Sequence, residues 1–389
     1  MKSFQEKVPE EFKGFCNDEQ YRRSGEYLRE TTKFGILYSG FTLFIIVAFW
    51  FLKGFVILDS AVRSWGFSPV VTGLFYMGIL LILKFIIDLP FSAYSTFAIE
   101  EKFGFNKTTL KVFITDKVKS MILSIIIGAP FLFSILLFFE HTGRNAWWIC
   151  WFVSTLFIIA VQFIVPTWIL PLFNKFTPLE SGELSRTVKA YADSIHFSVS
   201  NIFVMDGSRR STKSNAFFTG FGKNRRIVLF DTLVNNHSIN ELLAILAHEM
   251  GHYKKRHLLK NMVAGILQAG AIFFLMSLII HEKALFEAFF MENMSVYAGL
   301  IFFGLLYSPI DLILSVLMQI SSRRDEFEAD RFAVQTGDHA PHLINALKKL
   351  SVSNLSNLTP HPFHVFLNYS HPPVLDRISR LKSFRGTSP

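Results

Sequence analysis

The chain has 389 residues, of which 51% are hydrophobic and 44 are Phe, and its mean hydropathy is +0.36. This composition excludes an ordinary soluble globular protein and predicts an integral membrane protein. The net charge of +9 is accompanied by no nucleic-acid-binding motif, so we expect no nucleic-acid partner. We interpret the charge as a topology signal with an added attraction to membrane lipid.

Six apolar stretches of about 20 residues are long enough to cross a bilayer as helices. The predicted spans are 34–57, 70–90, 118–139, 147–171, 258–281 and 296–319. Lys84 and Asp88, four residues apart, indicate either an ion pair near a helix end or the lining of a water-filled cavity. The predicted fold is mainly α, a polytopic membrane protein with about six transmembrane helices.

Basic residues alternate between the segments that join the spans. The segments rich in Lys and Arg are 1–33, 172–257, 320–389 and the loop 91–117. By the positive-inside rule, these segments lie on the cytoplasmic side. The predicted organisation is an N-terminal segment 1–33, four spans in 34–171, a cytoplasmic domain 172–257, two spans in 258–319 and a C-terminal segment 320–389. The polar start of the chain predicts no cleaved signal peptide.

The segment between the fourth and fifth spans holds three predicted strands. They cover 200–205, 215–221 and 226–230, and a turn at 222–224 joins the last two into a β-hairpin. A peptide can bind to the edge of such a hairpin by adding a strand. We therefore expect a small α+β domain here, with an edge strand that is open to a peptide.

A capping-box pattern, Ser238 followed by Glu241, begins the helix that carries a His-Glu-Met-Gly-His motif. His248 and His252 are four residues apart, so they lie on one helical face and can hold one zinc ion. Glu249 between them can act as a base on a zinc-activated water. The alternative is an ordinary solvated helix that carries the same pair by chance.

A catalytic zinc site needs a third protein ligand and an open position. Glu326 and Asp330 share one helical face, so Glu326 could bind zinc while Asp330 accepts the N–H of a zinc-bound histidine. Asp325 or Glu328 could be the ligand instead, or the whole run could be a solvated charged helix. His257 is expected at the surface or beside the ligands rather than among them.

Nearly the whole chain resembles the type I CAAX prenyl endopeptidases, which are integral membrane zinc metalloproteases. The matching stretches are 97–109, 171–179, 214–217, 223–232, 248–253 and 371–377. The resemblance implies helices that enclose a water-filled chamber, with one zinc ion per chain at its cytoplasmic end. It also implies a zinc metalloendopeptidase whose substrates are prenylated, CAAX-type C-terminal peptides.

The resemblance also assigns individual site residues. It places the third zinc ligand on Glu326 with Asp330 behind it, and an oxyanion-stabilising histidine on His371. The positions that match substrate-binding residues of the family are Asn215, Ala216 and Arg377. For Arg377, a salt bridge that holds the C-terminal segment is an alternative to contact with substrate.

Eukaryotic members of this family have seven spans, the first of which precedes the part that matches residues 8–38. We therefore expect a shorter, bacterial-type member, in a bacterial inner membrane or the endoplasmic reticulum membrane. Cleavage of membrane or misfolded proteins, as by heat-shock-type membrane metallopeptidases, is an alternative function. A channel or receptor with structural zinc is a non-enzymatic alternative, which Glu249 disfavours because a structural site needs no base.

Overall fold

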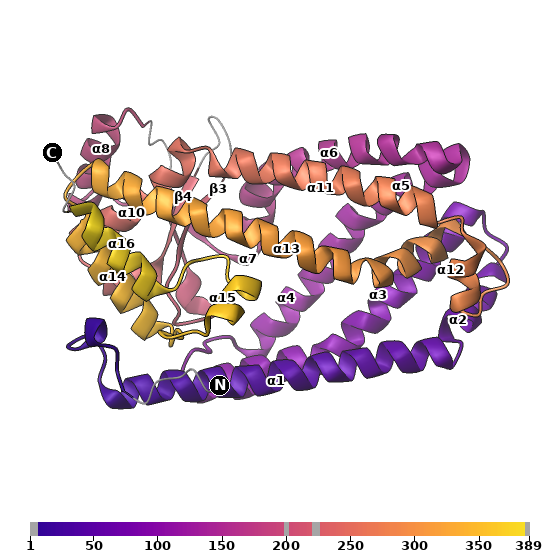
Figure 1. Ribbon diagram of the computed structural model, residues 1–389, viewed down its shortest axis with the longest axis horizontal. Coiled ribbons are helices and arrows are strands. Elements are labelled where there is room, and N and C mark those ends of the chain that lie inside the picture. Colours follow the sequence, from indigo (N-terminus) through magenta and orange to yellow (C-terminus); the bar gives the residue numbers. More distant parts are fainter. Residues whose placement is uncertain (1–6, 198–201, 220–225, 386–389) are drawn as a thin grey trace.

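The computed structural model describes residues 7–197, 202–219 and 226–385. Its helices are α1 (Asp18–Phe51), α2 (Gly54–Arg63), α3 (Pro69–Tyr94), α4 (Leu110–Leu123), α5 (Ala129–Thr142), α6 (Ala146–Ile164), α7 (Leu170–Phe173), α8 (Glu183–Ser194), α9 (Asp231–Asn236), α10 (Ile239–Lys254), α11 (His257–Ile279), α12 (Lys283–Ala288), α13 (Val296–Gln335), α14 (Ala340–Ser353), α15 (Pro362–Asn368) and α16 (Val374–Arg385). Figure 1 shows the long helices extending from one end of the molecule, where the sheet, α8, α10, α14 and α16 gather.

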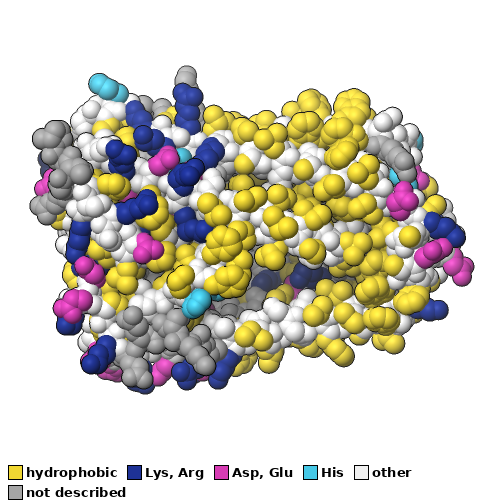
Figure 2. Space-filling view, in the orientation of Figure 1, with side chains coloured by type: hydrophobic (Ala, Val, Ile, Leu, Met, Phe, Trp, Pro, Cys, Tyr) yellow, Lys and Arg dark blue, Asp and Glu magenta, His cyan; other side chains and the backbone are white. Residues whose placement is uncertain are grey.

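Six helical stretches among the described residues are long and apolar enough to cross a membrane, which confirms the predicted polytopic helical fold. They are Asp18–Phe51, Pro69–Glu100, Leu110–Thr142, Ala146–Phe173, His257–Ile279 and Val296–Gln335. Apolar side chains form a broad surface over the long helices, whereas charged side chains collect toward the two ends (Figure 2). This distribution is that of a protein whose long helices lie in lipid.

The first predicted span, 34–57, is wrong at its C-terminal end. α1 ends at Phe51, and Lys53 takes a left-handed conformation with φ 56° before α2 begins at Gly54. A Cβ atom at position 54 would lie 2.5 Å from the ring of Phe49, so any other residue here would displace that ring. The apolar stretch therefore continues through a turn that hydropathy alone does not detect.

Two other predicted boundaries also move, because helices continue into polar sequence. A π-helical stretch, Ser95–Glu100, prolongs α3, so the connection to α4 is 101–109 rather than the predicted loop 91–117. α13 continues past the predicted end at 319 to Gln335. Helical backbone hydrogen bonds do not depend on an apolar side chain. The last span therefore carries Glu326 and Asp330 on its own extension.

The strands are β1 (Phe176–Pro178), β2 (Ile202–Met205), β3 (Ala216–Thr219) and β4 (Arg226–Phe230), in the sheet order β1-β2-β4-β3. β3 and β4 pair antiparallel, as predicted, with Ala216 opposite Leu229. The predicted turn at 222–224 lies outside the described residues. β2 pairs in parallel with β4. β1, which pairs antiparallel with β2, was not predicted, because its three residues are too few to show the alternation of apolar and polar side chains typical of a strand. β3 lies at an edge of the sheet.

The core beneath the sheet positions α10. Leu242, Leu246 and Met250 of α10 are buried in one cluster with Ile227 and Leu229 of β4. The predicted capping box is present, because the Ser238 hydroxyl accepts from the Glu241 N–H and the Glu241 carboxylate accepts from the Ser238 N–H. The capping box thus fixes where α10 begins, and the apolar cluster fixes which face of α10 packs against the sheet.

The N-terminal segment and the 101–109 connection lie at the same end of the molecule as α10. Phe12 packs with Leu358 and Ile378 of the C-terminal segment, and Asn106 forms a β-bridge with Ser211. The grouping agrees with the charge pattern of the sequence. Which side of a membrane this end faces stays a prediction.

α1 lies along one side of the bundle, and Figure 2 shows a hollow between it and the neighbouring helices, with basic side chains inside. Lys84 and Asp88 of α3 form the predicted ion pair, with Nζ 2.6 Å from Oδ2. Tyr38 of α1 donates to the same carboxylate at 2.8 Å. Polar side chains therefore bridge α1 and α3 in an otherwise apolar region.

Candidate metal centre and active site

His248 and His252 lie one turn apart on α10, with their Nε2 atoms 3.1 Å apart. α13 packs against α10 and brings Glu326 to the same place. Its Oε2 lies 3.5 Å from His248 Nε2 and its Oε1 lies 3.3 Å from His252 Nε2. These three side chains, which we call the metal triangle, could hold a metal ion.

The atoms of the metal triangle are spaced on the scale of a zinc site. A zinc ion bound tetrahedrally at about 2.0–2.1 Å separates its ligands by about 3.3–3.4 Å. Here the two Nε2 atoms lie 3.1 Å apart, and each lies 3.3 or 3.5 Å from a different oxygen of Glu326. The Oε2 atom of Glu326 is buried, makes no hydrogen bond among the described residues and faces Arg377 Nη1 at 3.3 Å. Asp325 and Glu328, the alternative ligands, lie instead beside His257.

Gly251 permits the close contact between α10 and α13. A Cβ atom at this position would lie 3.1 Å from the Cα and carbonyl oxygen of Ala329 and 3.2 Å from Phe332 Cβ. Backbone atoms cannot yield as the end of a flexible side chain can. The glycine of the His-Glu-Met-Gly-His motif therefore lets α10 approach α13 closely enough for the two histidines to lie beside Glu326.

Asp330 and Arg377 support the metal triangle from behind. The Nδ1 atom of His248 lies 2.9 Å from Asp330 Oδ1. Arg377 of α16 donates to both oxygens of Asp330, at 2.6 and 2.8 Å, and its Nη1 lies 3.3 Å from Glu326 Oε2. Arg377 is buried. The structure thus gives Arg377 the salt bridge that the sequence left as an alternative.

Electrostatics favour positive charge in the metal triangle. Burial acts to lower the pKa of His248, but hydrogen bonds to Asp330 and Glu326 outweigh it and raise the pKa to about 9. Burial also raises the pKa of Glu249 above its ordinary value, although the nearby histidines oppose this shift. A carboxyl group with a raised pKa is suited to take a proton and return it.

His257 begins α11, where Arg256 turns the chain with a left-handed φ of 59°. It is buried, and its Nδ1 atom lies 3.0 Å from Nδ1 of His252. The expectation that it lies at the surface is wrong, whereas a place beside the ligands is correct. His257 comes directly after the end of the metal-binding helix, and the turn at Arg256 folds its side chain back toward that helix. This position in the sequence is the signal that could have identified His257 as a neighbour of the ligands.

A pocket of about 150 Å³ joins the predicted site residues except His252 and Asp330. Its lining includes Asn215, Ala216, His248, Glu249, Glu326, His371 and Arg377. His371 Nδ1 lies 3.0 Å from Glu326 Oε1, and the His371 side chain is 67% exposed. The exposed His371 can therefore move toward a ligand that enters this pocket. Residues from four separate parts of the chain converge here.

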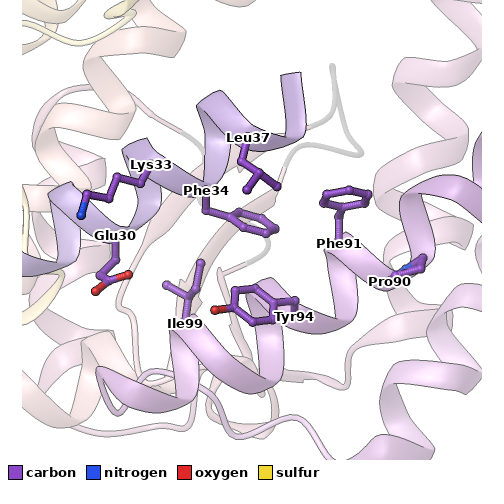
Figure 3. Close-up of a pocket in the computed structure, with 8 residues that line it drawn as sticks. All are labelled: Glu30, Lys33, Phe34, Leu37, Pro90, Phe91, Tyr94 and Ile99. Atoms are coloured by element: carbon purple, nitrogen blue, oxygen red, sulfur yellow. The ribbon is translucent and has the colours of Figure 1, made fainter. Parts of the chain in front are cut away.

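A second, apolar pocket of about 530 Å³ lies between α1 and α3. In Figure 3, Phe34 and Leu37 of α1 extend toward Phe91 and Tyr94 of α3. Glu30 and Lys33 mark its polar end (Figure 3). None of the predicted site residues lines this pocket.

Both halves of the chain match known families. Residues 1–175 match the family described as CAAX prenyl protease N-terminal, five membrane helices, and residues 178–385 match peptidase family M48. CAAX prenyl protease 1 of Saccharomyces cerevisiae is 36% identical over 404 residues, which cover 96% of this chain and 88% of that protein. The human CAAX prenyl protease 1 homolog is 34% identical over 82% of this chain and 76% of its own length.

A solved structure agrees along nearly the whole chain. The crystal structure of S. mikatae Ste24p aligns with a TM-score of 0.92 and 34% sequence identity, over 97% of this chain and 92% of that one. Fold and site thus define a multi-pass integral membrane metallopeptidase. The chain belongs to the CAAX prenyl protease family of M48 peptidases. Its substrate is a peptide or protein, and membership in a peptidase family removes the non-enzymatic alternative.

Proposed function

We propose that this protein is a zinc endopeptidase that cleaves CAAX-type prenylated C-terminal peptides. The observation that carries the proposal is the pocket that joins His248 and Glu326 of the metal triangle, Glu249 and the start of edge strand β3. The names of its relatives, CAAX prenyl proteases from yeast to human, support the substrate class.

Zinc fits the donor set of the metal triangle, because two imidazole nitrogens and one carboxylate oxygen leave a fourth position open. His248, His252 and Glu326 would hold one ion per chain. When bound, zinc polarises the scissile carbonyl and makes a water molecule more acidic. Asp330 orients His248, and we assign Arg377 to holding Asp330 and Glu326 in place rather than to substrate contact.

Glu249 and His371 would perform the proton transfer and charge stabilisation. Glu249 takes a proton from the attacking water and passes it to the amine that leaves, so the products are a carboxylate and an amine. His371, an exposed side chain in the pocket lining, donates a hydrogen bond to the oxyanion. Both side chains line the same pocket.

The backbone of the substrate would bind along β3. The Phe230 N–H donates to the carbonyl of Asn215, and Ala216 lies opposite Leu229. In this antiparallel register, the N–H of Ala216 points away from β4. It donates to the Asn215 side chain at 2.9 Å. An incoming strand can replace this local bond, which suits Asn215 and Ala216 to strand addition.

The apolar pocket between α1 and α3 is suited to the prenyl chain. Continuous packing connects it to the active site, because Leu355 packs against the cluster that contains Ile99, which lines the pocket. The neighbouring Asn354 side chain accepts from the Ser214 N–H and donates to its carbonyl. Ser214 lies two residues before edge strand β3, and we therefore assign this pocket to the prenyl chain of a substrate on β3.

We place the active site on the cytoplasmic side of the endoplasmic reticulum membrane or a bacterial inner membrane, because the basic segments gather at the α10 end. Single cysteines at Lys107 and Glu287, at opposite ends, can be labelled with an impermeant maleimide in sealed vesicles. The native Cys16 and Cys150 are buried. We expect labelling at position 107 from the cytoplasmic side alone, and the reverse pattern would contradict the orientation.

Cleavage of matched peptides, identical except for the prenyl group, tests the substrate class. We expect a higher kcat/KM for the prenylated peptide and no cleavage of either peptide after metal removal by chelator. Equal rates on both peptides, with activity on unfolded proteins, would favour the quality-control alternative. Undiminished activity of the metal-free protein would contradict the zinc mechanism itself.

A further inference from the structure

His257 contacts the metal triangle on one side and carboxylates on the other. Its Nδ1 atom lies 3.0 Å from His252 Nδ1. Its Nε2 atom lies 3.2 Å from Oε2 of Glu328 and 3.7 Å from Oδ1 of Asp325. The His257 side chain is only 4% exposed. Water therefore has little access to the ring, and these neighbours determine where its proton lies.

The contacts decide the tautomers of both histidines. Carboxylates accept hydrogen bonds, so the Nε2 atom of His257 carries the ring proton. In a neutral imidazole, Nδ1 then has the free lone pair and accepts a hydrogen bond from Nδ1–H of His252. With its proton on Nδ1, His252 presents an unprotonated Nε2 atom to the metal triangle. This is the tautomer that a metal ligand needs.

We propose that His257 is a positioning residue that fixes the tautomer and the ring orientation of His252, backed by Glu328. It is the counterpart of Asp330, which contacts the other motif histidine at 2.9 Å. Each histidine ligand thus has its own hydrogen-bond acceptor, a carboxylate for one and an imidazole for the other. The proposal rests on the proposed metal site and adds a residue to it.

A second metal ion bound by His257, Asp325 and Glu328 is the competing interpretation of this cluster. Lys260 Nζ lies 2.5 Å from Asp325 Oδ1. An ammonium group therefore already neutralises the carboxylate that a second ion would need. This ion pair favours the positioning role.

The test uses the full-length protein in detergent. His257→Asn keeps an acceptor near the Nδ1 position, whereas His257→Leu removes it at similar volume. His339→Leu is the matched control, because His339 is also buried but lies outside the metal triangle and both pockets. Glu328→Ala changes an exposed side chain that the fold tolerates. Zinc affinity is measured by competition with a chelator, and geometry by the absorption spectrum of bound Co²⁺.

We expect His257→Leu to weaken zinc binding about 10- to 100-fold and to change the Co²⁺ spectrum. His257→Asn and His339→Leu should remain near wild type, and Glu328→Ala should weaken binding several-fold. If His257→Leu fails to fold, the Asn and Glu328→Ala variants decide the question. Wild-type affinity in both His257→Leu and Glu328→Ala, equal losses in both His257 variants, or two zinc ions per wild-type chain would overturn the proposal. A wild-type protein that binds no metal would instead overturn the proposed function.

Discussion

His248 and Asp330 are joined across the interface of α10 and α13, with Nδ1 of the imidazole 2.9 Å from Oδ1 of the carboxylate. The Asp330 side chain is fully buried, and Arg377 of α16 holds it with two hydrogen bonds. α10, α13 and α16 must therefore pack together correctly before the Nε2 atom of His248 points at Glu326. Changes at this interface should affect metal binding before they affect the membrane helices.

Glu249→Ala should retain zinc and the folded structure but lose peptide cleavage. Proton transfer by such a carboxylate contributes about 10²–10⁴-fold to the rate. The measurements are kcat/KM on a prenylated peptide and zinc content by atomic absorption. Glu180→Ala, an exposed change outside the pocket, is the control. Normal turnover by the Glu249 variant would remove the glutamate from the mechanism.

Glu326→Ala should lose bound zinc, because only two of the three protein ligands remain. The fold should survive, since the buried Arg377 keeps its two hydrogen bonds to Asp330 when this carboxylate is removed. Zinc content after gel filtration measures the loss, and thermal unfolding checks the fold. Glu287→Ala, on an exposed carboxylate of α12, should keep one zinc per chain. A fully loaded Glu326 variant would place the third ligand elsewhere.

Gly251→Ala should reduce both stability and zinc affinity. The added methyl group meets the backbone of Ala329 at 3.1 Å, so α10 and α13 must separate. Overpacking of this kind costs about 1–3 kcal/mol. Gly265→Ala is the control, because nothing lies within 4 Å of its Cβ position. Unfolding temperature and chelator competition should both distinguish the two variants, and identical behaviour would refute the close-packing role.

The capping-box residue Glu241 should make stability dependent on pH. Burial opposes its ionisation, but the Lys349 ammonium at 2.7 Å and the Ser238 N–H outweigh burial and lower its pKa. A lowered folded-state pKa stabilises the fold above the unfolded pKa of about 4.3. That stability is lost as pH falls through the folded-state value.

Glu241→Gln should therefore lower the free energy of unfolding by about 1–3 kcal/mol at neutral pH. The difference from wild type should shrink on acidification below the ordinary Glu pKa. Thermal unfolding in detergent, followed from pH 7 to the most acidic pH at which the protein stays soluble, measures it. A difference that is independent of pH would assign the loss to packing instead.

Filling the pocket between α1 and α3 should affect prenylated substrates selectively. Leu37→Trp places a large ring where the prenyl chain is expected, so kcat/KM for the prenylated peptide should fall several-fold. The unprenylated peptide should be cleaved as before. Leu43→Trp is a matched control, because Leu43 lies on the same helix and is 63% exposed, against 62% for Leu37. Equal effects of both variants would exclude this pocket as the prenyl site.

Local sequence rules determined much of this protein. Hydropathy located six spans, because burial in lipid depends on the side chains of each helix alone. The spacing of His248 and His252 placed both on one face of α10, and Ser238 with Glu241 marked where that helix begins. Two short segments rich in apolar residues, joined by a predicted turn, indicated the β3–β4 pair. Each of these features depends on residues only a few positions apart.

Which carboxylate lies beside His248 and His252, and which side chains contact it, depends on tertiary structure. From the residues by themselves, Glu326 had Asp325 and Glu328 as alternatives, since the crossing of α10 and α13 sets their distances. The resemblance to a known family singled out Glu326, and the geometry agrees. The salt bridge of Arg377 with Asp330 and the contact of His257 with Glu328 followed no local rule. Both arise where helices distant in sequence pack together, which no short window of sequence encodes.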